Sequence, residues 1–333
     1  MTHHDSNATS TPLFEFVQLD LSTQKSLTSL ELESIRQFQG DNIKIGVDEL
    51  NEELAASLAS ISCCVDFVAL KDLNLNAARH LTHFKGYWLN FSALESISPD
   101  ALKALLAHFK QALTLGLPHL TCELSKVLSE SNLEALEFSR LITISSETAY
   151  WLSKSNARLE FVVLEALSGE TAAVLLNELR STVVFEKLQV DSLELASAFA
   201  THRGDLLLDG VRDLQPEIAE RLFQYQGELL ALTGLKAISL ETARKIALCE
   251  EQNTNLGSLW LGLETLDNET AELLANLKRG ICFMSLSEMS EDVGRILSTA
   301  KCKFLTFNNN IKLTQSAKDV LFAFPRNLSL RDY

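Results

Sequence analysis

The sequence predicts an α/β solenoid, in which short strands form a parallel sheet on the concave side and helices cover the convex side. Three observations lead to this prediction. Apolar residues recur every 23 or 24 positions along most of the chain. Each copy contains apolar residues two apart, which is the period of a short strand, and then apolar residues at helical spacing. A unit this small cannot bury its own apolar side, so neighbouring units must stack.

One apolar residue, here called the anchor, marks each copy. Successive anchors are 23 or 24 residues apart, except for one step of 28 between Leu235 and Leu263. The extra residues of that step lie within CEEQNTNLGS, and insertions in repeats usually form surface loops. The anchors are Val47, Leu70, Leu94, Leu117, Leu141, Leu164, Leu188, Val211, Leu235, Leu263 and Leu286.

Before each anchor, apolar residues two apart predict a strand with one buried face, as at Leu89 and Phe91 or Leu230 and Leu232. In five copies a glycine stands immediately before the anchor. We expect this turn to need either backbone freedom or a close approach to the next coil. The five glycines are Gly46, Gly116, Gly210, Gly234 and Gly262.

After each anchor, a small polar residue followed two positions later by an acid predicts the start of a helix, as at Ser98 with Asp100. The hydroxyl accepts a free backbone N–H, and the carboxylate faces the positive end of the helix. The other pairs are Ser145 with Glu147, Ser168 with Glu170, Ser239 with Glu241 and Ser290 with Asp292. Several helices run into a glycine suited to a left-handed C-terminal cap, namely Gly40, Gly86, Gly204, Gly227 and Gly280.

The composition, with 46% hydrophobic and 22% charged residues, is typical of a packed chain. We expect one solenoid over residues 13–333, with an N-terminal cap at 13–40, repeats over about 41–320 and a C-terminal cap at 321–333. Residues 1–12 are expected to be a disordered tail. Because the sequence shows no export signal and no long apolar run, we expect a cytoplasmic protein that does not enter a membrane.

The repeat resembles that of bacterial leucine-rich-repeat proteins, particularly units that read L-x-L-x-G-L-x-x-I-S-x-E-x-A-x-x-L. Clear copies are LALTGLKAISLETARKI from Leu230 and LEFVVLEALSGETAAVL from Leu159, and the resemblance covers about residues 40–320. The common leucine-rich repeat has Asn at the anchor position, whereas here only the last copy, LTFNNNIKL, offers one, Asn310. The backbone polar groups of the turn must therefore find other hydrogen-bond partners. The curvature of this solenoid therefore cannot be inferred from that of the family.

Outward strand residues line the concave face, which repeat proteins commonly use for binding. Two of the three tryptophans fall on outward positions, and tryptophan is enriched at binding hot spots. We therefore expect a site for a protein partner, with its apolar part close to the 28-residue step and including Ala231 and Cys282. The alternative is that Trp260 packs under the inserted loop. The predicted partner-binding residues are Trp88, Leu207, Leu229, Trp260 and Met284.

Charge narrows the choice of partner. The formal net charge is −15, which disfavours attraction to nucleic acid phosphate or anionic lipid. A basic or neutral protein fits better. The outward positions carry six acids and two bases, namely Asp66, Glu137, Glu160, Glu186, Asp205, Asp209, Lys44 and Arg158. The excess of acids over the frequency in the whole chain is within chance, so an acidic groove is only weakly indicated.

Catalytic motifs are absent from the sequence: there is no P-loop, G-x-G-x-x-G, H-E-x-x-H or G-x-S-x-G. The six cysteines show no C-x-x-C spacing and are expected to be reduced. His80, His83 and His108 recur near expected helix ends, where an imidazole favours the negative end of the helix dipole. We therefore predict a noncatalytic binding scaffold without metal or cofactor, the alternative being a structural, self-associating protein.

Overall fold

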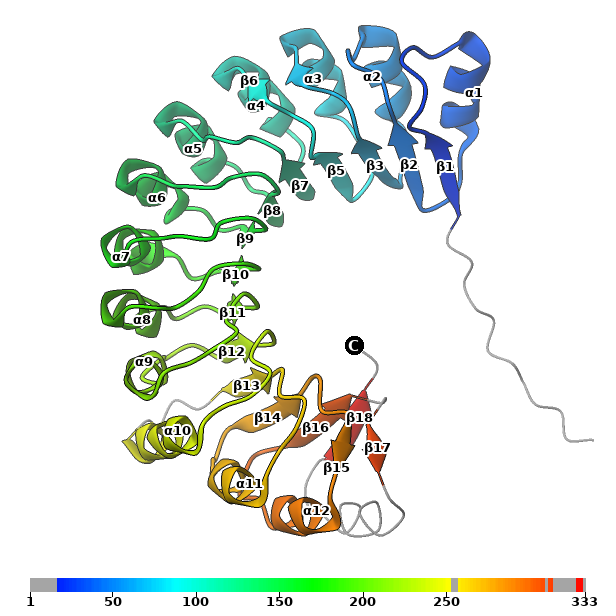
Figure 1. Cartoon of the computed structure of the whole chain (residues 1–333). Coiled ribbons are helices and arrows are strands. Elements are labelled where there is room, and N and C mark those ends of the chain that lie inside the picture. Colours follow the sequence, from blue (N-terminus) through cyan, green and yellow to red (C-terminus); the bar gives the residue numbers. More distant parts are fainter. Residues whose placement is uncertain (1–16, 253–256, 309–310, 314–327, 332–333) are drawn as a thin grey trace, which may run out of the picture.

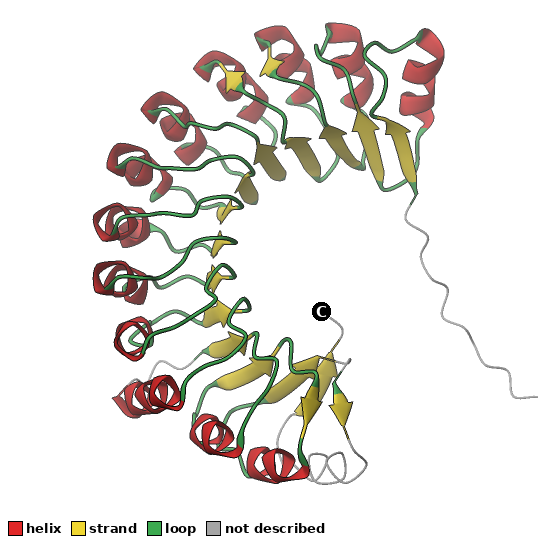
Figure 2. Ribbon diagram, in the orientation of Figure 1, coloured by secondary structure: helices red, strands yellow, loops and turns green. Residues whose placement is uncertain are grey.

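The computed structural model describes residues 17–252, 257–308, 311–313 and 328–331, and the structural statements below concern these residues. The chain forms an arc of stacked coils (Figure 1). Fourteen strands of this part of the chain form one sheet on the inner side, and twelve helices cover the outer side (Figure 2). The fold is thus an α/β solenoid, as the period predicts.

The strands of the sheet follow the chain in order, and every neighbouring pair is parallel. Their bounds are β1 Gln18–Leu21, β2 Asn42–Ile45, β3 Cys64–Phe67, β5 Trp88–Phe91, β7 Ala112–Leu115, β8 Ala135–Phe138, β9 Arg158–Phe161, β10 Val183–Phe185, β11 Leu206–Leu208, β12 Leu229–Leu232, β13 Ser258–Leu261, β14 Gly280–Phe283, β16 Leu305–Asn308 and β18 Leu328–Arg331. Short strands on the coil turns pair separately, β4 Asp72–Leu73 with β6 Ser96–Ile97 and β15 Glu288–Met289 with β17 Lys312–Leu313.

The helices alternate with these strands. Their bounds are α1 Ser29–Gln37, α2 Glu52–Leu58, α3 Leu75–Leu81, α4 Pro99–Leu106, α5 Cys122–Ser129, α6 Ser146–Leu152, α7 Gly169–Glu178, α8 Leu193–Ala200, α9 Pro216–Leu222, α10 Leu240–Gln252, α11 Asn268–Ala275 and α12 Glu291–Ser298. The serines predicted to start helices do so. Ser98, Ser145, Ser168 and Ser290 are N-caps whose hydroxyls accept a backbone N–H from the third helical residue, and Ser239 accepts the N–H of Thr242 at 3.0 Å.

The core lies between the sheet and the helices, and all eleven predicted anchors are buried there, none more than 3% exposed. Inward strand residues of adjoining coils meet because the strands are aligned in register. Phenylalanines stack along this direction, with ring centroids 5.3 Å apart between Phe138 and Phe161 and 5.2 Å between Phe161 and Phe185. Each coil therefore completes the core of its neighbours.

The glycines before the anchors are needed for close packing between coils. A Cβ on Gly234 would overlap the carbonyl oxygen of Asp209 in the preceding coil, and the same holds for Gly46, Gly116 and Gly262 against their preceding coils. No glycine in the described chain has a positive φ. Close approach, not unusual backbone angles, is therefore the reason for these glycines.

The prediction of left-handed C-terminal cap glycines is wrong, because none of these residues has a positive φ. Gly86 and Gly204 lie where the chain enters a strand, and a Cβ there would overlap carbonyl oxygens of Cys63 and Ser181 in the preceding coils. The physical reason for glycine at these positions is again the distance between coils.

In the common leucine-rich repeat an asparagine side chain hydrogen-bonds the backbone of this turn. Here backbone groups make the hydrogen bonds instead. The anchor N–H of Leu94 donates to the carbonyl oxygen of Phe91 at 3.0 Å. The N–H of Gly116 donates to the same carbonyl of the preceding coil at 2.9 Å. The sheet ladder thus extends one residue past β7, and the N–H groups of Val68, Ser139 and Val162 extend it in the same way past β3, β8 and β9. Asn310 lies outside the described residues.

The predicted caps are described in part. The segment 13–40 contains β1 and α1, which form a strand and helix that stack on the next coil. The segment 321–333 contains β18, which pairs with β16. The tail predicted at 1–12 lies outside the described residues. Within the described chain, no helix is long and apolar enough to cross a bilayer.

Candidate functional site

The concave face of the sheet is built from outward residues that lie side by side because the strands are in register. A central row runs across the sheet through the middle outward position of each strand. From β1 to β18 its residues are Asp20, Lys44, Asp66, Asn90, Thr114, Glu137, Glu160, Val184, Leu207, Ala231, Trp260, Cys282, Thr306 and Ser329. The row changes from polar and acidic to mainly apolar at Val184.

Four carboxylates form what we call the acidic stretch: Glu137 in β8, Glu160 in β9, Glu186 directly after β10 and Asp209 directly after β11. Glu137 and Glu160 are paired in register, and all four side chains are partly buried. Arg158 forms an ion pair with Glu160 at 2.9 Å. Thr233 donates a hydrogen bond from its hydroxyl to the Asp209 carboxylate.

Two of these carboxyls hold their protons more tightly than usual. Burial raises the pKa of Glu186 to about 7, and a hydrogen bond with Glu160 and the negative charges of Glu160, Glu137 and Asp209 add to this. Burial and the charge of Glu160 also raise the pKa of Glu137. At neutral pH the Glu186 carboxyl therefore holds its proton for part of the time, with the carboxylate of Glu160 in the adjoining coil as its hydrogen-bond partner.

What we call the apolar stretch is made of Leu207 in β11, Leu229 in β12, Trp260 in β13 and Met284 directly after β14. All four side chains are partly exposed. Ala231 and Cys282, which the sequence places in the same region, pair with Trp260 on its two sides and are buried, at 0% and 2% exposure. Four adjoining coils thus each place one partly exposed apolar side chain on the concave side.

Trp88 lies apart from this surface. It is in β5, and strands β7, β8, β9 and β10 separate it from Leu207. Its indole Nε1 donates to the Thr114 hydroxyl of the neighbouring strand at 2.8 Å. A hydrogen bond from Thr114 to Glu137 lowers the pKa of that carboxyl against the larger effect of burial. The structure thus brings together four of the five predicted residues and connects Trp88 with the acidic stretch instead.

The contact between Glu160 and Glu186 is the feature that sequence reasoning missed. Both residues are among the outward acids identified from the sequence. Comparing the number of these acids with the acid content of the whole chain does not indicate which side chains are in contact. Aligning the units by their anchors places the two acids in adjoining coils, Glu160 in the central row and Glu186 two residues after it. That alignment, and not composition, would have placed the two acids in one region, whereas their contact follows from the register of the folded sheet.

A polar residue occupies the core beside this part of the sheet. His202 is 0% exposed, and neither imidazole nitrogen has a hydrogen bond of ordinary geometry. Burial lowers the pKa of His202 to about 4, partly offset by the nearby carbonyl oxygens of Ser181 and Asp205. In the next coil Tyr225 takes the equivalent place and donates to the carbonyl oxygens of Gly204 and Leu229, the latter at 2.9 Å.

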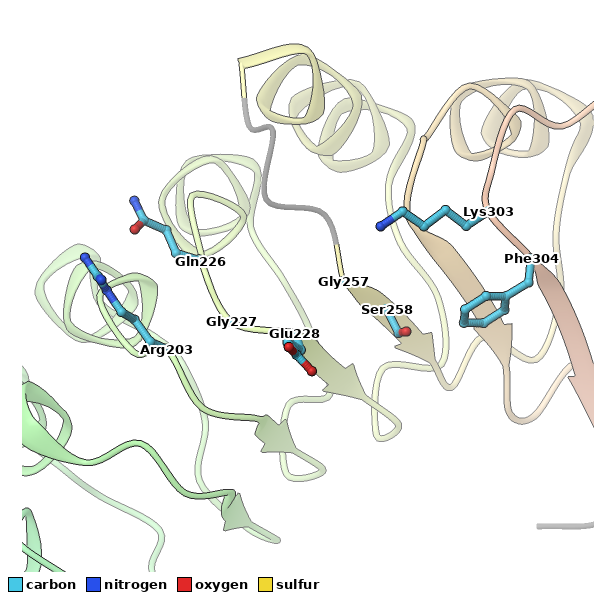
Figure 3. Close-up of a pocket in the computed structure, with 8 residues that line it drawn as sticks. All are labelled: Arg203, Gln226, Gly227, Glu228, Gly257, Ser258, Lys303 and Phe304. Atoms are coloured by element: carbon cyan, nitrogen blue, oxygen red, sulfur yellow. The ribbon is translucent and has the colours of Figure 1, made fainter. Parts of the chain in front are cut away.

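A cavity of about 720 Å³ opens at the entry side of β11 to β16. Arg203 and Gln226 lie on one side of it and Lys303 and Phe304 on the other (Figure 3). The floor includes Gly227, Glu228, Gly257 and Ser258. The charged lining residues Arg203, Glu228 and Lys303 are exposed, so this opening presents no desolvated polar group for chemistry.

Within the described residues, the histidines and cysteines make no cluster with metal-binding geometry. His83 and His108 stack at a centroid distance of 5.3 Å on the turns after α3 and α4. In the described part of the chain, no three His, Cys, Asp or Glu residues are grouped so that they could hold a metal ion. All six cysteines are free thiols.

The fold and this face define the chain as an α/β repeat solenoid with a two-part concave surface. No protein-family model matches the chain, and no curated protein matches it either. The solenoid class therefore rests on the structure, and the leucine-rich repeat remains a resemblance carried by the motif and the period.

Proposed function

We propose that this protein is a noncatalytic scaffold that binds a protein partner on the concave face of its sheet. The observation that carries the proposal is the apolar stretch of Leu207, Leu229, Trp260 and Met284 on four adjoining strands. Partly exposed apolar side chains gathered on one surface are typical of protein interaction sites, and tryptophan is enriched at their centres. A cytoplasmic location is part of the proposal, supported by six free thiols.

The noncatalytic part of the proposal is supported by how the titratable groups are used. The serines that precede acids cap helices, so they are engaged with backbone N–H groups. His202 is enclosed in the core and out of reach of a substrate. Catalysis needs reactive groups gathered in a cleft, and the cavity beside β13 is lined by exposed charges instead.

The test of the proposal is affinity capture from native cytosol with three versions of the full chain: wild type, Trp260→Asp and Leu248→Asp. Leu248 lies on helix α10 and is 56% exposed, so its variant places the same charge on the convex side. We expect a partner that wild type and Leu248→Asp retain and Trp260→Asp loses. Equal capture by all three folded proteins would contradict a concave site at Trp260.

Self-association is the second candidate, because the sheet of the described residues ends in two edge strands, β1 and β18. Among the described strands β1 pairs only with β2, and Leu30 and Val17 beside it are 82% and 53% exposed. Open strand edges and apolar ends favour pairing with another copy. Sedimentation velocity over a hundredfold range of concentration tests this candidate. A monomer throughout would contradict it, whereas dimerisation lost in Leu30→Asp would support it.

A further inference from the structure

We propose that the concave face accepts a short segment of a partner protein that carries two or more Lys or Arg side chains for the acidic stretch and a large apolar side chain for the apolar stretch. This inference rests on the proposed function and specifies the chemistry of the partner. It follows from three properties of the face: an excess of negative charge, the linear spacing of its carboxylates and the adjoining apolar surface.

The excess of charge is local. The three outward positions of each coil from β8 to β11 include five acids, the four of the acidic stretch and Asp205 directly before β11, against one base, Arg158. That base already pairs with Glu160 at 2.9 Å. Glu186 has a second carboxyl, that of Glu160, as its hydrogen-bond partner. An incoming ammonium or guanidinium group would replace this contact with a charge-assisted hydrogen bond.

The spacing of the carboxylates fits a chain better than an ion. The four carboxylates lie on four consecutive coils, and neighbouring strands are about 4.8 Å apart, so the acidic stretch spans about 14 Å. In the described residues they do not converge into a metal-binding group. An extended peptide advances about 3.4 Å per residue, so a segment of about five residues covers the acidic stretch.

The apolar stretch begins on the coil where the acidic stretch ends, with Leu207 two residues before Asp209. Val184 and Leu207 occupy the central row in β10 and β11, next to Glu186 and Asp209 on the same coils. From there the row leads to Trp260 across two more strands. A segment that lies along the row would meet carboxylates at one end and the indole at the other. Its length would be about eight residues at the same advance per residue.

Charge complementarity also selects among occupants. A nucleic acid would bring phosphates to the carboxylates and is repelled. A second copy of this chain would bring a surface from a protein with 44 acids and 29 bases. A basic segment of a different protein gains from both parts of the face, and an electrostatic field focused by a concave wall of one sign raises its association rate.

The experiment selects phage-displayed random 12-residue peptides on the immobilised full chain and measures the affinity of the enriched peptides by fluorescence anisotropy. The acidic variant is Glu137→Gln, Glu160→Gln, Glu186→Gln and Asp209→Asn. The control variant changes the net charge equally at exposed positions away from the acidic stretch, Glu130→Gln, Glu165→Gln, Asp213→Asn and Glu272→Gln. Each amide is isosteric with the carboxyl that it replaces, so we expect both variants to fold. Circular dichroism verifies this.

We expect enriched peptides with at least two Lys or Arg and one large apolar residue. Their affinity should fall at least tenfold in the acidic variant and less than twofold in the control variant. Their affinity should also fall in Trp260→Asp. Enrichment of peptides without positive charge, or equal losses in both quadruple variants, would overturn the inference. If such peptides still lose affinity in Trp260→Asp, the proposed concave site stands while its charge specificity fails. If no peptide is enriched, the proposed binding function fails as well.

Discussion

His202 is the residue with the least favourable environment in the described core. Its equivalents in other coils, identified by the same backbone turn, include Phe84, Leu277 and Tyr225. Two of these are apolar, and Tyr225 is satisfied by two carbonyl oxygens. His202 has no hydrogen bond of ordinary geometry at either nitrogen. The His202 imidazole is thus neutral in the core of the solenoid at neutral pH.

The first prediction concerns pH and His202. Because the pKa of His202 is lowered from 6.5 to about 4, the unfolded chain binds a proton that the folded chain does not between these values. The free energy of unfolding should therefore fall as the pH drops below about 6.5, by about 3 kcal/mol when pH 4 is reached. Urea unfolding of wild type and His202→Phe at several pH values measures this difference.

His202→Phe is the control. Phe84 is buried at the equivalent position of an earlier coil, so phenylalanine fits this position. We expect the gap between the two proteins to widen steadily from pH 7 to pH 4. A gap that is independent of pH would mean that the imidazole is protonated, or solvated, in the folded protein.

Glu186 should change the pH dependence of the free energy of unfolding in the opposite direction to His202. Its pKa is raised from 4.5 to about 7, so between these values the folded chain binds the extra proton, and the stability contributed by this group is lost as the pH rises. Glu186→Gln removes the titration, so the variant should gain stability relative to wild type as the pH increases from 4.5 to 7.5. The measurement is urea unfolding at matched pH values. Glu165→Gln, an exposed change, should show no such trend.

At the scale of one element, the turn between strand and helix depends on how closely two coils approach. Gly234 leaves no room for a Cβ next to the carbonyl oxygen of Asp209. Its own carbonyl oxygen accepts a hydrogen bond from Arg212 Nη1 at 3.2 Å. The turn is therefore packed against the preceding coil on its backbone side, and a methyl group must push the coils apart.

We predict that Gly234→Ala lowers the free energy of unfolding by about 1 to 3 kcal/mol, the usual range for inserting an atom into a packed site. The control is Lys236→Ala in the same turn, which removes an exposed ion pair with Glu264 at 3.4 Å and should cost less than about 1 kcal/mol. Chemical denaturation of both variants measures the difference. Equal effects would mean that the turn relaxes freely.

At the scale of the whole molecule, stability comes from stacking one unit on the next. Each strand pairs with the strands of adjoining coils, and helices also contact their neighbours in sequence. Such a stack is close to one-dimensional, so an internal unit can be removed if the flanking units are left in register.

Removing residues 142–164, one complete unit of 23 residues, joins Leu141 to Glu165 and leaves β8 to stack on β10. We expect this chain to fold with an unchanged circular dichroism spectrum per residue and cooperative thermal unfolding. Removing only residues 142–152 deletes α6 and leaves β8 without the helix of its unit. That chain should lose most of its cooperativity. If both deletions behave alike, the units are not independent modules.

The sequence by itself determined the period, the buried anchors, the serines that start helices and the residues that face outward. These follow from spacing within one unit, because alternation and helical periodicity are local properties of the chain. Only the tertiary structure decided which outward residues meet: Glu160 with Glu186, Trp88 with Thr114, and Trp260 with the apolar stretch but not with Trp88. Those contacts depend on the register and curvature of the stack, which packing between coils sets and no single unit encodes. The same packing explains the glycines, whose need arises from the neighbouring coil.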